Sequence, residues 1–294
     1  MNTPTATADD GLLEIDVTKT RRNGIRISWR MIVSYALLLL LASVYFGPLF
    51  MLGSTAFKTN REFNIDATAL PAQINFDNFE EAWSRANFPQ YMFNSSLYAF
   101  TATAIYVITA LFVAFPIARG YIKGGNIVLT LFVIALFLPP ALIPQFQLIL
   151  GLGLYNTRPG YILLLVTNPI GIIILVGYLK SLPRELDEAA AMDGCGYFRF
   201  MWSIVFPLAR PIVATVIVLH AIGIWNELIL ATIYLTNDAF YPITRGLLVF
   251  QGVYGSDWPV LASAVLLMAM PMVILFLFLQ RYIISGLTAG AVKE

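Results

Sequence analysis

Long uncharged runs are the feature of this sequence that most constrains its fold. Five runs contain no Asp, Glu, Lys or Arg, and a sixth contains only Glu227. The runs are residues 31–57, 86–118, 124–157, 159–179, 211–237 and 258–280. A helix that crosses the hydrocarbon core of a bilayer needs about 20 consecutive apolar residues, so each run is long enough for one crossing. The sequence therefore predicts an all-α membrane protein with six transmembrane helices.

Composition excludes several other classes of protein. The chain is 59% hydrophobic and 12% charged, whereas a soluble domain carries roughly 25% charged residues. The net charge of +1 provides no basic field for nucleic acid. One cysteine, Cys195, cannot form an intramolecular disulfide, and one histidine, His220, cannot form a histidine-rich metal cluster. Because phosphate-loop and hydrolase motifs are also lacking, we expect no metal, no cofactor and no catalysis in this chain.

Basic residues predict the orientation in the membrane. If the N-terminus is cytoplasmic, 13 of the 18 lysines and arginines fall on the cytoplasmic side, as the positive-inside bias requires. Both termini are then cytoplasmic. Only Lys58, Arg61, Arg85, Arg158 and Arg245 fall outside.

Prolines interrupt two of the predicted spans. Pro139 and Pro140 lie in the third span, and Asn168-Pro169 begins the fourth. Proline removes a backbone donor, and freed carbonyls inside a bilayer are tolerated where protein or a wet cavity surrounds them. Gln145, Gln147 and Asn168 are therefore candidate residues of a substrate pathway, with irregular packing as the alternative.

A polar segment, residues 181–210, separates the fourth and fifth spans. Ser181 is predicted to cap a helix that Gly194 ends in a left-handed conformation. A second helix is predicted from Tyr197 and must stop at Pro207. Four carboxylates crowd the first helix, so a basic partner would stabilise it. A solvated amphipathic loop is the alternative.

This segment contains Glu188-Ala189-Ala190, Asp193-Gly194, Phe200, Ile204, Pro207 and Pro211. The order and spacing of these residues resemble the E-A-A loop of permease subunits of binding-protein-dependent ABC importers. The resemblance implies a type I ABC importer permease fold, in which this coupling loop, residues 181–210, docks in a groove of the ATPase subunit. It implies coupling roles for Glu188, Ala189, Ala190, Asp193 and Gly194. Cys195 and Phe206 depart slightly from the pattern.

The C-terminal sequence is similar to that of maltose-type carbohydrate permeases. Gln280-Arg281-Tyr282 and residues 286–293 carry this likeness, and Trp225-Asn226-Glu227 resembles the W-N-[DE]-F of that group, with Leu228 in place of phenylalanine. The resemblance implies a sugar importer of the bacterial plasma membrane. Its implied partners are a second permease subunit, two ATPase subunits that hold ATP and Mg, and an extracytoplasmic sugar-binding protein.

The same resemblance divides the chain into four parts. Residues 1–30 are predicted to be a cytoplasmic tail, and 31–87 the first transmembrane helix with an external loop. Residues 88–283 are the core transmembrane domain, including the coupling loop. Residues 284–294 are a cytoplasmic C-terminal tail.

One ionisable residue lies within the fifth span. At helical spacing, His220, Gly223, Glu227 and Tyr234 share one face, and an intramembrane carboxylate normally faces the bundle interior or water. Glu227 and its neighbour Asn226 are therefore candidates to line the sugar path. Glu227 could instead tie two helices together or be protonated.

Three alternatives remain open at this stage. A permease of the same type could carry a non-sugar solute such as glycerol-phosphate or a polyamine. An intramembrane enzyme could use Glu227 and His220, although seven helical residues hold them about 10 Å apart. A channel or secondary carrier is the third.

Overall fold

The described chain folds almost entirely into helices. The computed structural model describes residues 29–85, 87–252 and 255–291. One antiparallel pair of two-residue strands, β1 (Gln251–Gly252) and β2 (Gly255–Ser256), is the only sheet in this part of the chain. The α-helices are α1 (Trp29–Ala56), α2 (Asn60–Ile65), α3 (Asp77–Arg85), α4 (Phe88–Arg119), α5 (Gly125–Ala135), α6 (Leu142–Gly151), α7 (Arg158–Leu165), α8 (Pro169–Ser181), α9 (Glu185–Met192), α10 (Tyr197–Phe200), α11 (Phe206–Trp225), α12 (Ile229–Tyr234), α13 (Ile243–Gly246) and α14 (Trp258–Ala291).

The chain divides into two compact units, and the boundary between them falls within the residues of α1. The first unit ends at Phe50, and the second begins at Met51. In the first unit, α1 is apolar and long enough to cross a membrane, and its large apolar side chains are exposed. A helix that is apolar on all sides suits a hydrocarbon environment, which agrees with the predicted first transmembrane helix.

All six predicted apolar segments contain helix, but the third, fourth and fifth are interrupted. Four helices are long and apolar enough to cross a membrane: α1, α4, the continuous helix Tyr197–Trp225 and residues 258–280 of α14. The fourth predicted segment is a pair, α7 and α8, bent by 46°. The third is divided into α5 and α6 at the Pro139-Pro140 pair. Each of these helices is only about 16 Å long, about half the thickness of the hydrocarbon core.

The predicted tails are only partly described. Residues 1–28 and 292–294 lie outside the described part of the chain. Residues 284–291, predicted to be a tail, continue α14 as helix.

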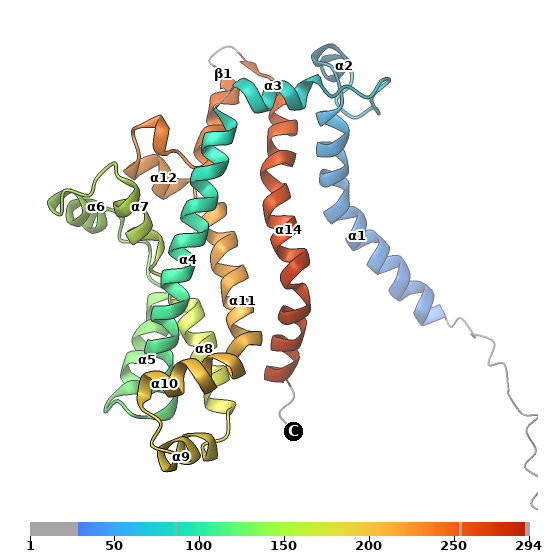
Figure 1. Cartoon of the computed structure of the whole chain (residues 1–294). Coiled ribbons are helices and arrows are strands. Elements are labelled where there is room, and N and C mark those ends of the chain that lie inside the picture. Colours follow the sequence, from blue (N-terminus) through green and yellow to red (C-terminus); the bar gives the residue numbers. More distant parts are fainter. Residues whose placement is uncertain (1–28, 86, 253–254, 292–294) are drawn as a thin grey trace, which may run out of the picture. The chain divides into compact units, whose positions relative to one another are not determined.

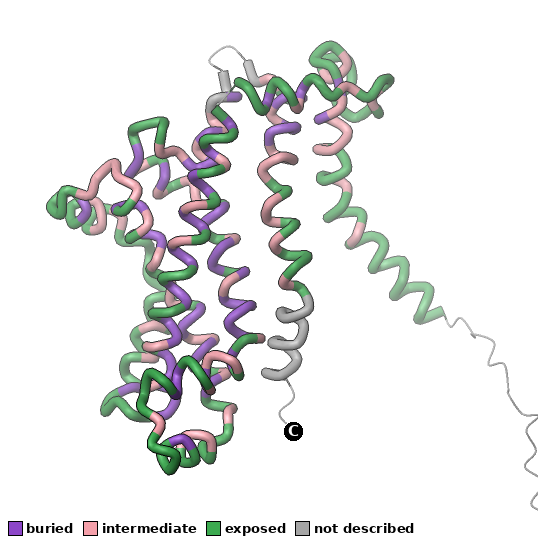
Figure 2. Tube along the Cα trace, viewed as in Figure 1, coloured by how far each residue is buried: buried purple, intermediate pink, exposed green. Residues whose placement is uncertain are grey.

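The second unit is organised around α4, which contacts α5, α7, α8, α11 and α13. Its buried face includes Ala99, Ala102, Tyr106, Ala110 and Ala114, which recur every three or four residues. Small residues at this spacing let neighbouring helices approach closely in a membrane. Figure 2 shows buried positions along both α4 and α11.

The loop between α1 and α4 is folded. The Nζ of Lys58 donates to the carbonyl oxygens of Asp66, at 3.2 Å, and Ala67, at 2.7 Å. The amide nitrogen of Asn78 donates to the carbonyls of Ala56 and Lys58. The Lys58 bonds satisfy backbone oxygens just after α2, and the Asn78 bonds satisfy oxygens at and just after the end of α1 that the helix leaves free.

The fifth predicted span is not one helix, so the predicted polar stripe is wrong. α11 ends at Trp225, and α12 begins at Ile229. The side chain of Asn226 donates to the carbonyl of Ile222 at 2.9 Å, and Glu227 Oε1 accepts from the Leu230 N–H at 2.8 Å. These side chains compete with the backbone for its helical partners and favour a break. Glu227 and Tyr234 therefore do not continue the helix of His220.

The predicted stop at Pro207 is also wrong. Residues 197–225 are continuously helical, with a π-helical segment, Met201–Val205, between α10 and α11. In this segment the N–H of Phe206 bonds to the carbonyl of Met201. Pro207 lies two residues after the π-helical segment, and both features bend the helix without ending it. Figure 1 shows α10 running at a marked angle to α11.

Close packing of α8 gives a prediction about stability. A Cβ at Gly171 would overlap the Tyr106 hydroxyl and lie 2.9 Å from Val216 Cγ1. We expect Gly171→Ala to destabilise the protein by about 1–3 kcal/mol, because overpacking must displace these neighbours. Gly177→Ala on the same helix is the matched control, since nothing lies within 4 Å of its Cβ position. Thermal unfolding of the purified protein checks this, and equal midpoints for the two variants would contradict the packing.

Candidate functional site

A cavity of about 680 Å³ lies where the third and fourth apolar segments face α4. Its volume falls within the range of about 300–1,000 Å³ that is typical of small-molecule sites. The α5–α6 break contributes Pro139, Pro140 and Ala141, and the α7–α8 break contributes residues 166–169. α4 contributes Tyr106, Thr109, Ala110 and Val113. The prolines thus mark a cavity as well as irregular packing.

Polar groups at the α7–α8 break are partly satisfied within the protein. The side-chain oxygen of Asn168 accepts from the Ile170 N–H at 2.9 Å and caps α8. The Tyr106 hydroxyl donates to the Asn168 carbonyl at 2.6 Å, so one freed carbonyl finds a donor on α4. The Asn168 side-chain amide nitrogen has no partner among the described residues and remains available as a donor.

Gln145 is the second polar group of this cavity. Its half-buried side chain lines the cavity from α6, and its amide makes no hydrogen bond within the described part of the chain. An amide that has both a donor and an acceptor free can bind a hydroxyl group in either sense. Gln145 and Asn168 are therefore the two predicted pathway residues that the fold brings together.

The other three predicted pathway residues lie outside this cavity. Gln147 is exposed on α6, and Asn226 is exposed where α11 ends. Glu227 is half-buried, and its carboxylate closes the first turn of α12. The structure gives Glu227 a local structural contact, and its role toward substrate stays a prediction.

His220 connects two helices. Its ring, 4% exposed, stacks on Tyr106 of α4 at 4.1 Å between centroids, and its Nδ1 lies 3.1 Å from Thr103 Oγ1. The same Tyr106 supports the Asn168 carbonyl. His220 thereby joins α11 to α4 beside the cavity. Sequence reasoning overlooked Tyr106 and Thr109, because hydroxyl residues on an apolar helix give no signal of the cavity they will face.

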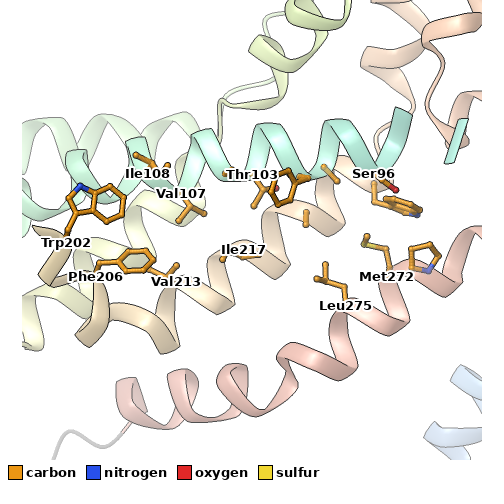
Figure 3. Close-up of a pocket in the computed structure, with 16 residues that line it drawn as sticks. Ser96, Thr103, Val107, Ile108, Trp202, Phe206, Val213, Ile217, Met272 and Leu275 are labelled. Atoms are coloured by element: carbon orange, nitrogen blue, oxygen red, sulfur yellow. The ribbon is translucent and has the colours of Figure 1, made fainter. Parts of the chain in front are cut away.

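A second hollow has a different chemistry. It is a groove of about 470 Å³ between α4, α11 and α14, and Figure 3 shows apolar side chains such as Val107, Ile217 and Leu275 lining it. Its hydroxyl residues are Ser96 and Thr103, and each hydroxyl is already bonded within the protein. The indole N–H of Trp202 is the one side-chain donor without a partner among its described lining residues, so the groove can replace few of the water bonds of a sugar.

The coupling loop presents a small, partly acidic surface. Gly194 has φ of +64°, so it ends α9 in the predicted left-handed conformation. Glu188, Ala189 and Asp193 are exposed, whereas Ala190 is buried in the helix core. The predicted Ser181 cap is wrong, because Ser181 is the last residue of α8 and bonds to the Tyr178 carbonyl.

Arg119, at the end of α4, holds the start of α9 in place. Its guanidinium donates to the carbonyls of Leu182, at 2.8 Å, and Pro183, at 3.2 Å. Its Nη2 also lies 2.8 Å from Asp187 Oδ2, with the two side chains only 4% and 14% exposed. The sequence predicted a basic partner for the acidic cluster. For Asp187, that partner is Arg119 of the same chain.

Tyr121 completes this arrangement. Its hydroxyl donates to Asp187 Oδ1 at 2.9 Å. Burial, together with the bond to Asp187, raises the pKa of Tyr121, so the hydroxyl keeps its proton at neutral pH. Oδ1 of Asp187 thus accepts a hydrogen bond, while Oδ2 faces the Arg119 guanidinium at ion-pair distance.

Comparison with known proteins identifies the family. The family described as "Binding-protein-dependent transport system inner membrane component" matches residues 91–288. This chain belongs to that family. It is therefore a membrane permease of a binding-protein-dependent transport system, as the E-A-A resemblance predicted.

Two curated relatives of this permease come from Bacillus subtilis strain 168. The melibiose/raffinose/stachyose import permease protein MelC is 31% identical over 86% of this chain and 94% of its own length. The probable ABC transporter permease protein YurM is 33% identical over 88% and 87%. Both alignments span nearly the whole of each protein.

Solved structures confirm the type I permease fold. A chain of a bacterial ABC transporter involved in the import of the acidic polysaccharide alginate superposes with a TM-score of 0.77 at 22% identity. The match covers 86% of this permease and 95% of that chain.

The contact of Glu227 with α12 gives a second prediction. Glu227→Ala removes an acceptor from a helix start and should destabilise the permease by about 0.5–2 kcal/mol. Glu227→Gln keeps a side-chain oxygen for the Leu230 N–H and should lose little stability. Thermal unfolding of both variants in lipid nanodiscs tests this, and equal losses would show that the charge itself has a further partner.

Proposed function

We propose that this permease is one of two transmembrane subunits of an ATP-binding-cassette sugar importer and forms half of its translocation pathway. ATP and Mg bind to two separate ATPase subunits, and an extracytoplasmic sugar-binding protein delivers the substrate. The supporting observation is the cavity at the two helix breaks, where Gln145 and Asn168 offer free amide groups inside an apolar bundle.

The chemistry of the cavity favours an uncharged polar substrate. None of the described residues that line it carries a charge. Moving a phosphate or an ammonium group into such a site without a counter-charge costs much free energy, whereas sugar hydroxyls need only donors and acceptors. MelC supports the same class, since it is an import permease for melibiose, raffinose and stachyose. Glycerol-phosphate and polyamines are the less favoured substrates.

The coupling loop is proposed to face the ATPase subunits. Exposed Glu188, Ala189 and Asp193 form its outer surface, while Ala190 and Gly194 let α9 pack and turn. This places α9 and both termini in the cytoplasm, consistent with 13 of 18 basic residues on that side.

A pair of glutamines tests the cavity. Gln145→Leu should reduce sugar uptake by about tenfold, because it removes hydrogen bonds worth about 1 kcal/mol each and places an apolar group among the substrate hydroxyls. Gln147→Leu, two residues along α6 and outside the cavity, is the control and should retain uptake.

The measurement is uptake of labelled oligosaccharides, glycerol-phosphate and a polyamine by proteoliposomes that contain the assembled complex, normalised to its amount. Transport of a charged solute in place of sugar would overturn the substrate class. Equal uptake by the two leucine variants would place the pathway elsewhere.

Thiol labelling tests the orientation. In a Cys195→Ser background, a cysteine at the exposed position of Gln73 should react with a membrane-impermeant reagent added outside the cytoplasmic membrane. A cysteine at Met192, which is 89% exposed on α9, should react only after the membrane is opened. The reverse pattern would invert the proposed topology.

A further inference from the structure

One buried guanidinium attaches the start of α9 to the end of α4. Arg119 bonds to Leu182 and Pro183, which lead into α9, and pairs with Asp187 in its first turn. The Arg119 guanidinium also lies 5.8 Å from the centre of the Phe115 ring. That ring packs edge-on against Phe200 of α10, at 5.7 Å between centroids. The segments that precede and follow α9 thus both contact the same end of α4.

α4 also reaches the candidate substrate cavity. Val113 and Tyr106 line that cavity and lie six and thirteen residues before Arg119. At 1.5 Å per residue they are about 9 and 20 Å from it along the helix. One continuous helix, with Pro116 inside it, therefore extends from the attachment of α9 to the cavity wall.

We propose that Arg119, Asp187 and Tyr121 form a latch that makes α9 and α4 move together and so transmits ATPase motion to the cavity. Arg119 and Asp187 are positioning residues that contact neither ATP nor substrate. The proposal rests on the proposed docking of α9 on an ATPase subunit.

Burial and geometry distinguish the latch from an ordinary surface ion pair. An exposed pair contributes little, because solvent screens it and both side chains are flexible. Here the guanidinium is almost wholly buried and already bonded to two carbonyls, and Tyr121 holds the second carboxylate oxygen. Removing one charge leaves the other buried and unpaired, so the arrangement resists separation of α9 from α4.

The other carboxylates of α9 lack this role. Glu185 and Glu188 are exposed and have no ion-pair partner among the described residues. Glu188 is free to contact a partner subunit, whereas Asp187 faces inward to Arg119. These two neighbouring residues of α9 therefore have different proposed roles: Glu188 contacts the partner subunit, and Asp187 couples α9 to α4.

The test uses the assembled complex and a readout that does not depend on the substrate. Gln145→Cys in a Cys195→Ser background places a thiol in the cavity, and its labelling rate is measured with and without MgATP. We expect MgATP to change this rate in the unmodified latch by about tenfold, within the usual range of coupling between sites. Asp187→Asn should abolish most of that change while the ATPase still copurifies and hydrolyses ATP.

Two further variants keep the outcome decisive. Glu185→Gln removes one charge from the same turn of α9 without altering the latch, so any effect of helix charge alone appears there as well. Tyr121→Phe keeps the ion pair and removes one hydrogen bond, and should reduce the MgATP effect partially. If Asp187→Asn fails to assemble, Tyr121→Phe carries the test.

An MgATP effect in Asp187→Asn or Tyr121→Phe equal to that of Glu185→Gln would overturn the latch. Failure of an ATPase to copurify even with the unmodified permease would instead refute the proposed function.

Discussion

Backbone polar groups inside a bilayer must find partners within the protein, and this constraint shapes the permease. α4 remains one long helix despite Pro116 near its end, whereas the prolines of the third and fourth apolar segments coincide with breaks in the helix. At these breaks, side chains supply hydrogen-bond partners for backbone groups. Tyr106 donates to the Asn168 carbonyl, and Asn168 caps α8. Gly171 then leaves room for Tyr106 to reach that carbonyl.

The same solution creates the candidate site. Two helix breaks that face one helix leave a space that neither α5–α6 nor α7–α8 fills. The polar groups that remain free there are neutral amides, which suit hydroxyl groups and give a charged solute no counter-charge. The apolar groove beside α11 and α14 has no such groups to offer (Figure 3). Polarity, and not volume, therefore separates the two hollows by function.

α4 gives the permease its internal connection. Its small residues pack closely against α8 and α11, Tyr106 faces the cavity, and Arg119 holds the coupling loop. A closely packed helix transmits displacement because its neighbours cannot be compressed. This arrangement offers a direct physical route between the proposed ATPase surface and the proposed substrate path.

The sequence by itself determined the membrane class, the apolar segments, the breaks at Pro139-Pro140 and Asn168-Pro169, and the left-handed turn at Gly194. These follow from local chemistry: charge, hydrophobic length, a missing donor and a positive φ. The tertiary structure alone decided that Gln145 and Asn168 share a cavity while Gln147 does not, and that Asp187 pairs with Arg119, 68 positions earlier in the sequence. Asn226 and Glu227 also ended a helix that their apolar surroundings predicted to continue, because their side chains took backbone partners. Such contacts depend on which groups meet after packing, and hydrophobic pattern along one chain carries no information about that.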